Sequence, residues 1–144
     1  MPTSRTPIQF FFETRDFSLR ERTRLKSFIE TIFRKERTRL GSLNYIFVSD
    51  KRLLEINRDY LKHDYYTDII TFDLSSGPAT IGEIYISTDR VRDNARDLGQ
   101  PLYRELHRVI FHGALHLCGY KDKSPKDIKL MRQKEEEYLN GYFG

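Results

Sequence analysis

Patterns typical of strands and helices follow one another in a set order, and this order limits the folds open to the chain. Four short segments rich in aromatic and β-branched residues predict strands, at residues 8–12, 43–48, 68–74 and 81–87. After residue 87 the chain carries only helix signals. We therefore expect an α+β fold in a single domain over 1–144, with about four strands in one mixed sheet and about five helices packed on it.

Helix starts and ends are marked by capping residues and by Gly or Pro. Ser18 and Glu21 have the spacing of a capping box, which predicts a helix from there to about Arg39, followed by Gly41. Four more helices are expected over about 49–60, 89–98, 101–118 and 124–139. Their predicted boundary residues are Ser49, Ser87 or Thr88, Gly99, Pro101, Gly119, Ser124 and Pro125.

Composition excludes several classes of protein. The 144 residues are 38% hydrophobic, which is enough for a packed core. Cys118 is the only cysteine, so neither an intrachain disulfide nor a thiolate metal cage can form. No apolar run is long enough for a signal peptide or a membrane helix, so we expect a cytoplasmic protein with no membrane partner. The net charge of +4 permits a polyanionic partner without requiring one.

The strongest chemical motif lies on the helix expected over 101–118. His112 and His116 are four residues apart, so both imidazoles lie on one helix face and can bind one metal ion. Gly119 permits a left-handed turn that can return Asp122 to the same ion. Two histidines and one carboxylate leave a coordination position open, as catalytic metal sites do. The alternatives are a chance pair of histidines and an Asp122 that caps the last helix or lies in solvent.

The residue after the first histidine narrows the reaction class. The metzincin proteases share the spacing of this motif and carry a Glu there as general base. Here the position is Gly113, so peptide hydrolysis lacks its base and another substrate is favoured. The other histidines, His63 and His107, are expected to be structural or exposed. Cys118 points to another helix face and is expected to be buried and inert.

A second feature is the basic charge of the helix expected over 18–39. Residues 15 to 39 include nine Lys or Arg and four Asp or Glu, and the rest of the chain is close to neutral. Such a cluster can bind a phosphate backbone, and a solvated helix face is an equal alternative. The candidate RNA-binding residues of this helix are Arg20, Arg24, Arg34 and Arg37.

Three blocks of sequence occur in the order of a known family. NRDY at 57–60 followed by TDIITF at 67–72 is similar to N-x-x-Y and then T-D-V-L-S-F. GEIYIS at 82–87 is similar to G-D-I-x-I-S, and HGALHLCGYKD at 112–122 is similar to H-G-x-L-H-L-x-G-Y-D-H. On these blocks the chain resembles the bacterial YbeY family of metal-dependent endoribonucleases.

The resemblance implies both a metal and a substrate. By position, His112, His116 and Asp122 would hold one divalent metal, zinc by resemblance, with Asp122 in the place of the family's third His. An alternative alignment leaves that third ligand missing. The implied activity is that of a single-strand-specific endoribonuclease in ribosomal RNA maturation and ribosome quality control. The implied partners are a ribosomal RNA precursor and components of the small ribosomal subunit.

The sequence departs from the family at one cation. The family has an Arg after the Tyr of its first block, where this chain has Leu61; Arg58 or Lys62 could replace it as an RNA phosphate contact. Our hypothesis is phosphodiester cleavage in which the metal polarises a phosphoryl oxygen or activates a water or the ribose 2′-hydroxyl. Lys62 or Lys121 would then act as a catalytic cation that stabilises the developing charge.

Two acidic residues at predicted strand positions are further candidate site residues. Asp68 and Glu83 could orient ligands or loops, although hydrogen bonding at strand ends is the simpler role. The rival function is a ribosome-assembly RNA-binding factor whose metal is mainly structural. A metzincin-like peptidase is a third possibility, which Gly113 opposes.

Overall fold

The computed structural model describes residues 6–144, so the first five residues of the expected domain lie outside it. The described chain has four strands and five helices, which confirms the predicted α+β class. In chain order they are β1 (Ile8–Phe12), α1 (Arg22–Lys35), β2 (Leu40–Val48), α2 (Asp50–Leu61), β3 (Ile69–Asp73), β4 (Thr80–Ser87), α3 (Thr88–Leu98), α4 (Leu102–Leu117) and α5 (Pro125–Phe143).

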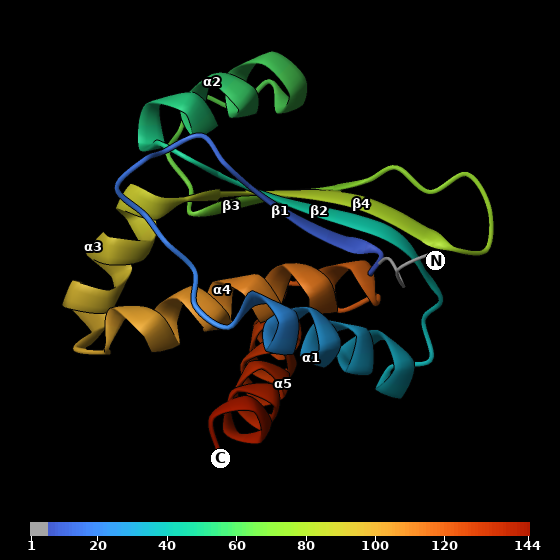
Figure 1. Ribbon diagram of the computed structural model, residues 1–144. Coiled ribbons are helices and arrows are strands. Elements are labelled where there is room, and N and C mark those ends of the chain that lie inside the picture. Colours follow the sequence, from blue (N-terminus) through green and yellow to red (C-terminus); the bar gives the residue numbers. More distant parts are fainter. Residues whose placement is uncertain (1–5) are drawn as a thin grey trace, which may run out of the picture.

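The four strands form one mixed sheet in the order β1-β2-β4-β3. β1 and β4 both pair with β2 in parallel, and β3 pairs with β4 in antiparallel orientation. α2 lies on one face of the sheet, α1 and α4 lie on the other, and α5 crosses beneath them (Figure 1). β3 is thus an edge strand, and α4 passes beneath the sheet close to it.

The main core lies between the sheet and the α1–α4 layer. Alternate residues of β2, namely Leu43, Tyr45 and Phe47, are fully buried on this side, as the period of a half-buried strand requires. Gly82 and Gly113 let α4 approach the sheet closely. A Cβ atom at Gly113 would lie 2.7 Å from Cδ1 of Ile84, so this position of α4 faces the core.

Most of the predicted boundaries hold, because they rest on local capping. The side chains of Ser49, Ser87 and Ser124 each accept a hydrogen bond of 3.1 Å from a backbone N–H of the helix that follows. Ser124 and Asp127 form a full capping box with Pro125 at the first helical position. Pro101, by contrast, precedes α4 as its N-cap residue and is not its first helical residue.

The prediction for the first helix was wrong at both ends. α1 begins at Arg22, and its N-cap is Glu21 in the left-handed conformation (φ 52°) without a side-chain capping bond, so Ser18 is not the cap. Leu19 is buried in the main core, and the segment after Ser18 follows the path that buries it. At the other end α1 stops at Lys35, short of the predicted Arg39. The chain enters β2 at Leu40, which pairs with Thr80 of β4. Tertiary packing overrides local helix signals at both ends.

None of the helices within residues 6–144 is both long enough and apolar enough to cross a membrane.

Candidate active site

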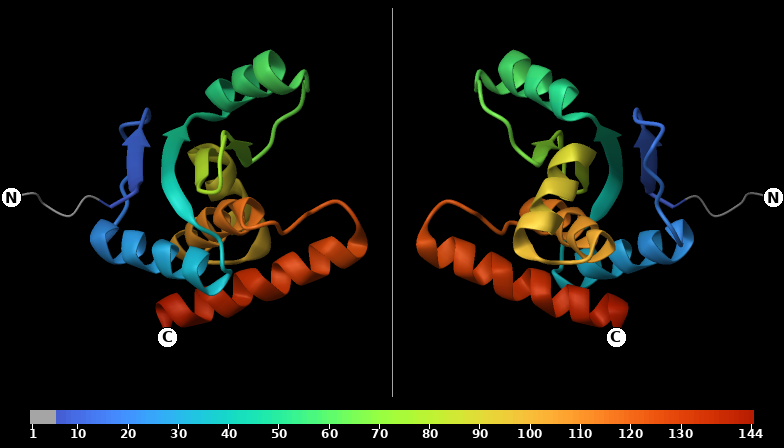
Figure 2. Two further views of the ribbon diagram at one scale, coloured as in Figure 1. Left: turned by 90° about the vertical axis from the view of Figure 1, so that its right-hand side faces the viewer. Right: turned by 90° about the vertical axis from the view of Figure 1, so that its left-hand side faces the viewer.

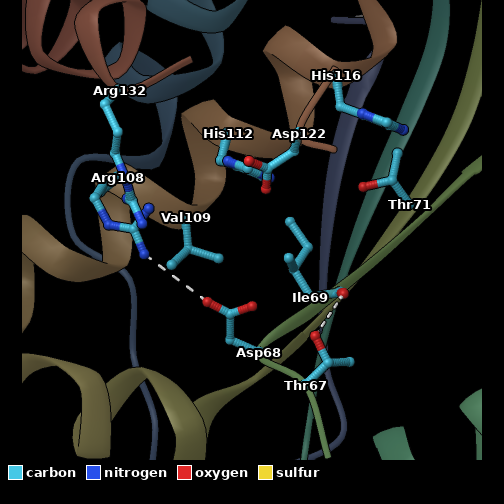
Figure 3. Close-up of a pocket in the computed structure, with 10 residues that line it drawn as sticks. All are labelled: Thr67, Asp68, Ile69, Thr71, Arg108, Val109, His112, His116, Asp122 and Arg132. Carbon is cyan, nitrogen blue, oxygen red and sulfur yellow. Dashed lines mark hydrogen bonds and ion pairs between the residues drawn. The ribbon is translucent and has the colours of Figure 1, made fainter. Parts of the chain in front are cut away.

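A pocket of about 350 Å³ opens between α4 and the edge strand β3 (Figure 3). Residues from four separate parts of the chain meet there: the start of β3, one face of α4, the connection after α4, and α5. The lining residues are Thr67, Asp68, Ile69, Thr71, Arg108, Val109, His112, His116, Asp122 and Arg132. The pocket therefore contains the three residues that the sequence suggested as metal ligands.

Local helix geometry aligns the two histidines. Positions four apart lie one above the other on a helix, so His112 and His116 share the face of α4 that lines the pocket. α4 ends at Leu117, and Gly119 adopts a φ of +107° that reverses the chain. After this turn, Oδ2 of Asp122 lies 3.6 Å from Nε2 of His112. The His116 ring lies on the Thr71 side of the pocket (Figure 3).

Each imidazole is held through its Nδ1 atom. Nδ1 of His112 lies 2.6 Å from Oε2 of Glu135, and Nδ1 of His116 lies 3.1 Å from the carbonyl oxygen of Tyr120. A carboxylate and a carbonyl can only accept, so both Nδ1 atoms carry the proton and donate it. In the neutral form of each imidazole, this leaves the lone pair of Nε2 available, which is the form that binds a metal.

The types of donor atom suit a divalent metal, although the side chains that carry them are not close enough together to bind one ion. Within residues 6–144, no three His, Cys, Asp or Glu side chains are grouped closely enough to hold a metal ion as they stand. His112 and His116 nevertheless offer two free Nε2 atoms in one pocket, and the half-exposed carboxylate of Asp122 adds an oxygen. Rotation of side chains would have to bring the three donors together.

Glu135 is a site residue that the sequence reasoning missed. It lies on α5, is only 2% exposed, and is the hydrogen-bond partner of His112. The only signal in the sequence is its place in the core face of that helix, among Met131, Tyr138 and Leu139. A charged residue at such a position needs a buried partner. That partner lies 23 residues away in the chain, so no local pattern identifies it.

Arg108 neutralises this buried carboxylate. Its Nη1 donates to Oε1 of Glu135 at 3.1 Å, while its Nε and Nη2 form a bidentate pair with Glu105 at 2.8 and 2.7 Å. Arg132 also donates to Oε1 of Glu135, at 3.0 Å. Burial by itself would raise the pKa of Glu135, but the hydrogen bond from His112 and the charge of Arg108 outweigh it and lower that pKa. Glu135 is therefore held as a carboxylate.

The two acidic residues singled out on strands have different surroundings. Asp68 lies in the pocket, where Nδ2 of Asn94 donates to it at 3.1 Å and Nη2 of Arg108 lies 3.8 Å away. Glu83 lies outside the pocket, where it accepts a hydrogen bond of 3.2 Å from the hydroxyl of Tyr85. The structure thus brings Asp68, but not Glu83, to the histidines.

The predicted catalytic lysines are not among the pocket residues. Lys62 ends α2 in a left-handed conformation, and Lys121 lines a different cavity beside Glu36 and Tyr120. Arg58 is exposed and forms an ion pair of 2.5 Å with Asp64. The cations that line the pocket are Arg108 and Arg132.

The basic residues of the first helix region also lie away from the pocket. The residue that follows α1, Glu36, lies beside the start of the connection between α4 and α5, where it accepts a hydrogen bond of 2.7 Å from the hydroxyl of Tyr120. This contact belongs to a separate cavity, which shares no described lining residue with the pocket, and the rest of the connection runs away from α1 (Figure 2). The guanidinium of Arg24 lies 4.0 Å from the ring centroid of Tyr142, and that of Arg20 lies 4.8 Å from that of Tyr103. Arg34 and Arg37 are exposed at the end of α1.

The remaining histidines and the cysteine have structural surroundings. His107 is fully buried, and burial lowers its pKa to about 4, so it is neutral at pH 7. His63 is exposed and stacks on Tyr65. Cys118 is half-buried, less than expected, and burial raises the pKa of its thiol to about 11. A thiol with so high a pKa stays protonated at pH 7 and is unreactive, in agreement with the prediction that it is inert.

Two imidazoles with oriented protons, two carboxylates and two arginines in one pocket define a hydrolase-type site suited to phosphate esters. Residues 9–142 match the sequence profile of the family described as Endoribonuclease YbeY. The chain belongs to this family, whose members are named as endoribonucleases and thus as hydrolases that act on RNA.

Individual relatives agree with this family membership over nearly the whole chain. The chain is 51% identical over 134 residues to Endoribonuclease YbeY of Cytophaga hutchinsonii, and 50% identical over 132 residues to that of Flavobacterium psychrophilum. Each match covers 92% of this chain and 94% of the relative. A Thermotoga maritima protein of known solution structure shares the fold, with a TM-score of 0.62 and 28% identity over 95% of this chain and 89% of that one.

Proposed function

We propose that this protein is a metal-dependent, single-strand-specific endoribonuclease that acts on a ribosomal RNA precursor, in rRNA maturation and ribosome quality control. The proposal includes a cytoplasmic location, contacts with the small ribosomal subunit, and a single catalytic domain over 1–144. Its main support is the pocket in which His112, His116 and Asp122 meet an arginine pair, in a chain of the endoribonuclease YbeY family.

The proposed cofactor is one divalent metal, zinc, held by His112, His116 and Asp122. Two imidazole nitrogens and one carboxylate oxygen are ligands that zinc accepts, and three protein ligands are typical of catalytic zinc sites. When bound, such a metal supplies Lewis acidity toward a phosphoryl oxygen.

The residues around the donors have separate roles in this proposal. Glu135 keeps the proton of His112 on Nδ1, and the carbonyl of Tyr120 does the same for His116. Arg108 keeps Glu135 ionised from within the protein. Arg132 has an exposed guanidinium at the pocket wall, where it can bind a phosphate of the substrate strand. Lys62 and Lys121 remain candidate cations, in second place because neither lines the pocket.

The test compares wild type with His116→Ala, and uses His63→Ala as a matched control outside the pocket. Metal content is measured by elemental analysis, fold by circular dichroism, and cleavage on matched single-stranded and duplex RNA. We expect His116→Ala to keep its fold but lose bound metal and cleavage, while His63→Ala keeps both.

The same assay distinguishes the proposed endoribonuclease from the rival RNA-binding function. Metal-replete wild type that binds RNA but cuts no single-stranded RNA would overturn the proposal in favour of an RNA-binding assembly factor. Wild type that contains no metal yet cuts RNA would overturn the metal part alone.

A further inference from the structure

Four charged or metal-binding side chains form a line along α4. Arg104, Arg108, His112 and His116 are each four residues apart, so they form a ridge that rises about 6 Å and turns about 40° around the helix at each step. The line consists of two guanidinium groups followed by two imidazoles. Neighbouring phosphates of an extended nucleic-acid strand are separated by a similar step.

A second cavity extends this line beyond the pocket. It measures about 390 Å³ and shares Arg108 and Arg132 with the first pocket, so the two cavities adjoin at this arginine pair. The second cavity continues past them to Arg104, Gln100 and Leu98, where α3 ends and α4 begins. The surface depression along α4 is therefore longer than the pocket around the histidines.

The three arginines of this groove are not equally free. Arg108 is 16% exposed and is committed to Glu105 and Glu135. Arg132 is 58% exposed and lies on the wall of both cavities, with one hydrogen bond of 3.0 Å from its Nη1 to Glu135, a carboxylate that Arg108 also holds. Arg104 donates to Glu136 at 2.6 Å, but Glu136 is 61% exposed, and surface ion pairs of this kind contribute little stability. A phosphate can compete for Arg104 and Arg132, but hardly for Arg108.

We propose that an unpaired RNA strand runs along this line of α4. Arg132 binds the phosphate next to the scissile one, and Arg104 binds the phosphate after that. The inference rests on the proposed function and adds the path of the substrate. Guanidinium groups suit this role because their planar fork pairs with phosphate oxygens in a bidentate manner. The exposed side chain of Leu98 offers apolar surface to the nucleotide at the far end.

The competing surface is the basic end of α1. Arg34 is exposed there, and the nearby Glu36 lines a separate cavity with Tyr120 and Lys121. That cavity shares no described lining residue with the two cavities of the groove. A strand bound at that surface would not lie in the groove. Arg34 is therefore a matched control of equal charge at a different place.

The experiment measures binding of a fluorescein-labelled, unstructured oligouridylate by anisotropy over a range of salt concentrations. A chelator prevents cleavage, and a denaturing gel verifies that the probe remains intact. We expect Arg104→Gln and Arg132→Gln each to weaken binding roughly threefold to tenfold. Each should also reduce the slope of log affinity against log salt by about 0.7, the loss of one phosphate contact on a single strand.

Three further variants sharpen the test. Arg104→Lys should keep the salt slope, because it keeps the charge. Glu136→Gln should tighten binding, because it removes the carboxylate that competes for Arg104. Arg34→Gln should bind as wild type does. All variants should melt within about 2 °C of wild type. Arg34 and Glu136 are exposed, and the half-buried Arg104 pairs with Glu136. Glu135 keeps Arg108 as a partner when Arg132 is replaced.

The outcomes separate this inference from the function on which it rests. Wild type that cuts RNA, with Arg104→Gln and Arg132→Gln unchanged in affinity and slope, would overturn the path along α4 and leave the endoribonuclease intact. A loss of affinity in Arg34→Gln alone would move the strand to α1. If wild type neither binds nor cuts RNA, the proposed function fails and the path fails with it.

Discussion

Nδ1 of His112 and Oε2 of Glu135 lie 2.6 Å apart, and this hydrogen bond joins α4 to α5. Because Glu135 is buried and ionised, it fixes both the ring orientation and the protonated nitrogen of His112. The final helix thus contributes to the site through a residue that does not line the pocket.

Replacing Glu135 should weaken metal binding. Glu135→Gln keeps the volume but removes the charge that holds His112, and losses of about 10–100-fold in metal affinity are typical for such partners. Competition with a chromophoric chelator measures the zinc affinity. Glu137→Gln, an exposed neighbour on the same helix, is the control and should bind zinc as wild type does. Equal affinity in both variants would show that Glu135 does not support the site.

Removing Arg108 should destabilise the fold strongly. Arg108→Met leaves the carboxylates of Glu105 and Glu135 buried without their main partner, at a cost of about 3–5 kcal/mol in the free energy of unfolding. Urea denaturation measures this cost. Arg96→Met, on the exposed face of α3, should change stability by less than about 0.5 kcal/mol. A similarly small effect at Arg108 would contradict the buried network.

The buried His107 predicts a pH dependence of stability. Its pKa is about 4 in the folded protein, lowered mainly by burial, against 6.5 for the free side chain. Between these values the unfolded chain binds the extra proton, so stability should fall as pH drops from about 6.5 toward 4, by roughly 2–3 kcal/mol.

The variant His107→Phe isolates this contribution. It keeps an aromatic ring in the cluster with Tyr142 and removes the titrating group. Unfolding free energies of wild type and variant are compared at several pH values between 4 and 7. The difference should change in favour of the variant as pH falls. A difference that does not vary with pH would mean that His107 is protonated equally in both states.

Two glycines in helices should respond oppositely to alanine. A Cβ at Gly113 would lie 2.7 Å from Cδ1 of Ile84, whereas a Cβ at Gly141 would meet Cζ of Phe28 at an ordinary 3.6 Å. Gly141→Ala should stabilise the protein by about 0.5–1 kcal/mol through helix propensity. Gly113→Ala should destabilise it by about 1–2 kcal/mol, because overpacking exceeds that gain. Thermal unfolding measures both, and stabilisation by Gly113→Ala would disprove the close approach of α4 to β4.

Sequence patterns predicted those parts of the fold that depend on neighbouring residues. The caps at Ser49, Ser87 and Ser124 hold because a side chain there satisfies a backbone N–H within three residues. The shared helix face of His112 and His116 follows from the 3.6-residue period alone. Strand positions also hold, because each strand buries alternate side chains.

The tertiary structure alone decided which distant groups surround the histidines. Ser18 and Glu21 have the right spacing for a cap, yet α1 begins only at Arg22, and Leu19 between them packs into the main core. Arg132 and Asp68 line the pocket, and Glu135 reaches His112, because α5 and β3 pack beside α4. Contacts between segments so far apart in the chain have no local signature. The sequence determined which residue types can perform the chemistry. Packing decided which of them meet, because burial of apolar surface sets how the elements lie against one another.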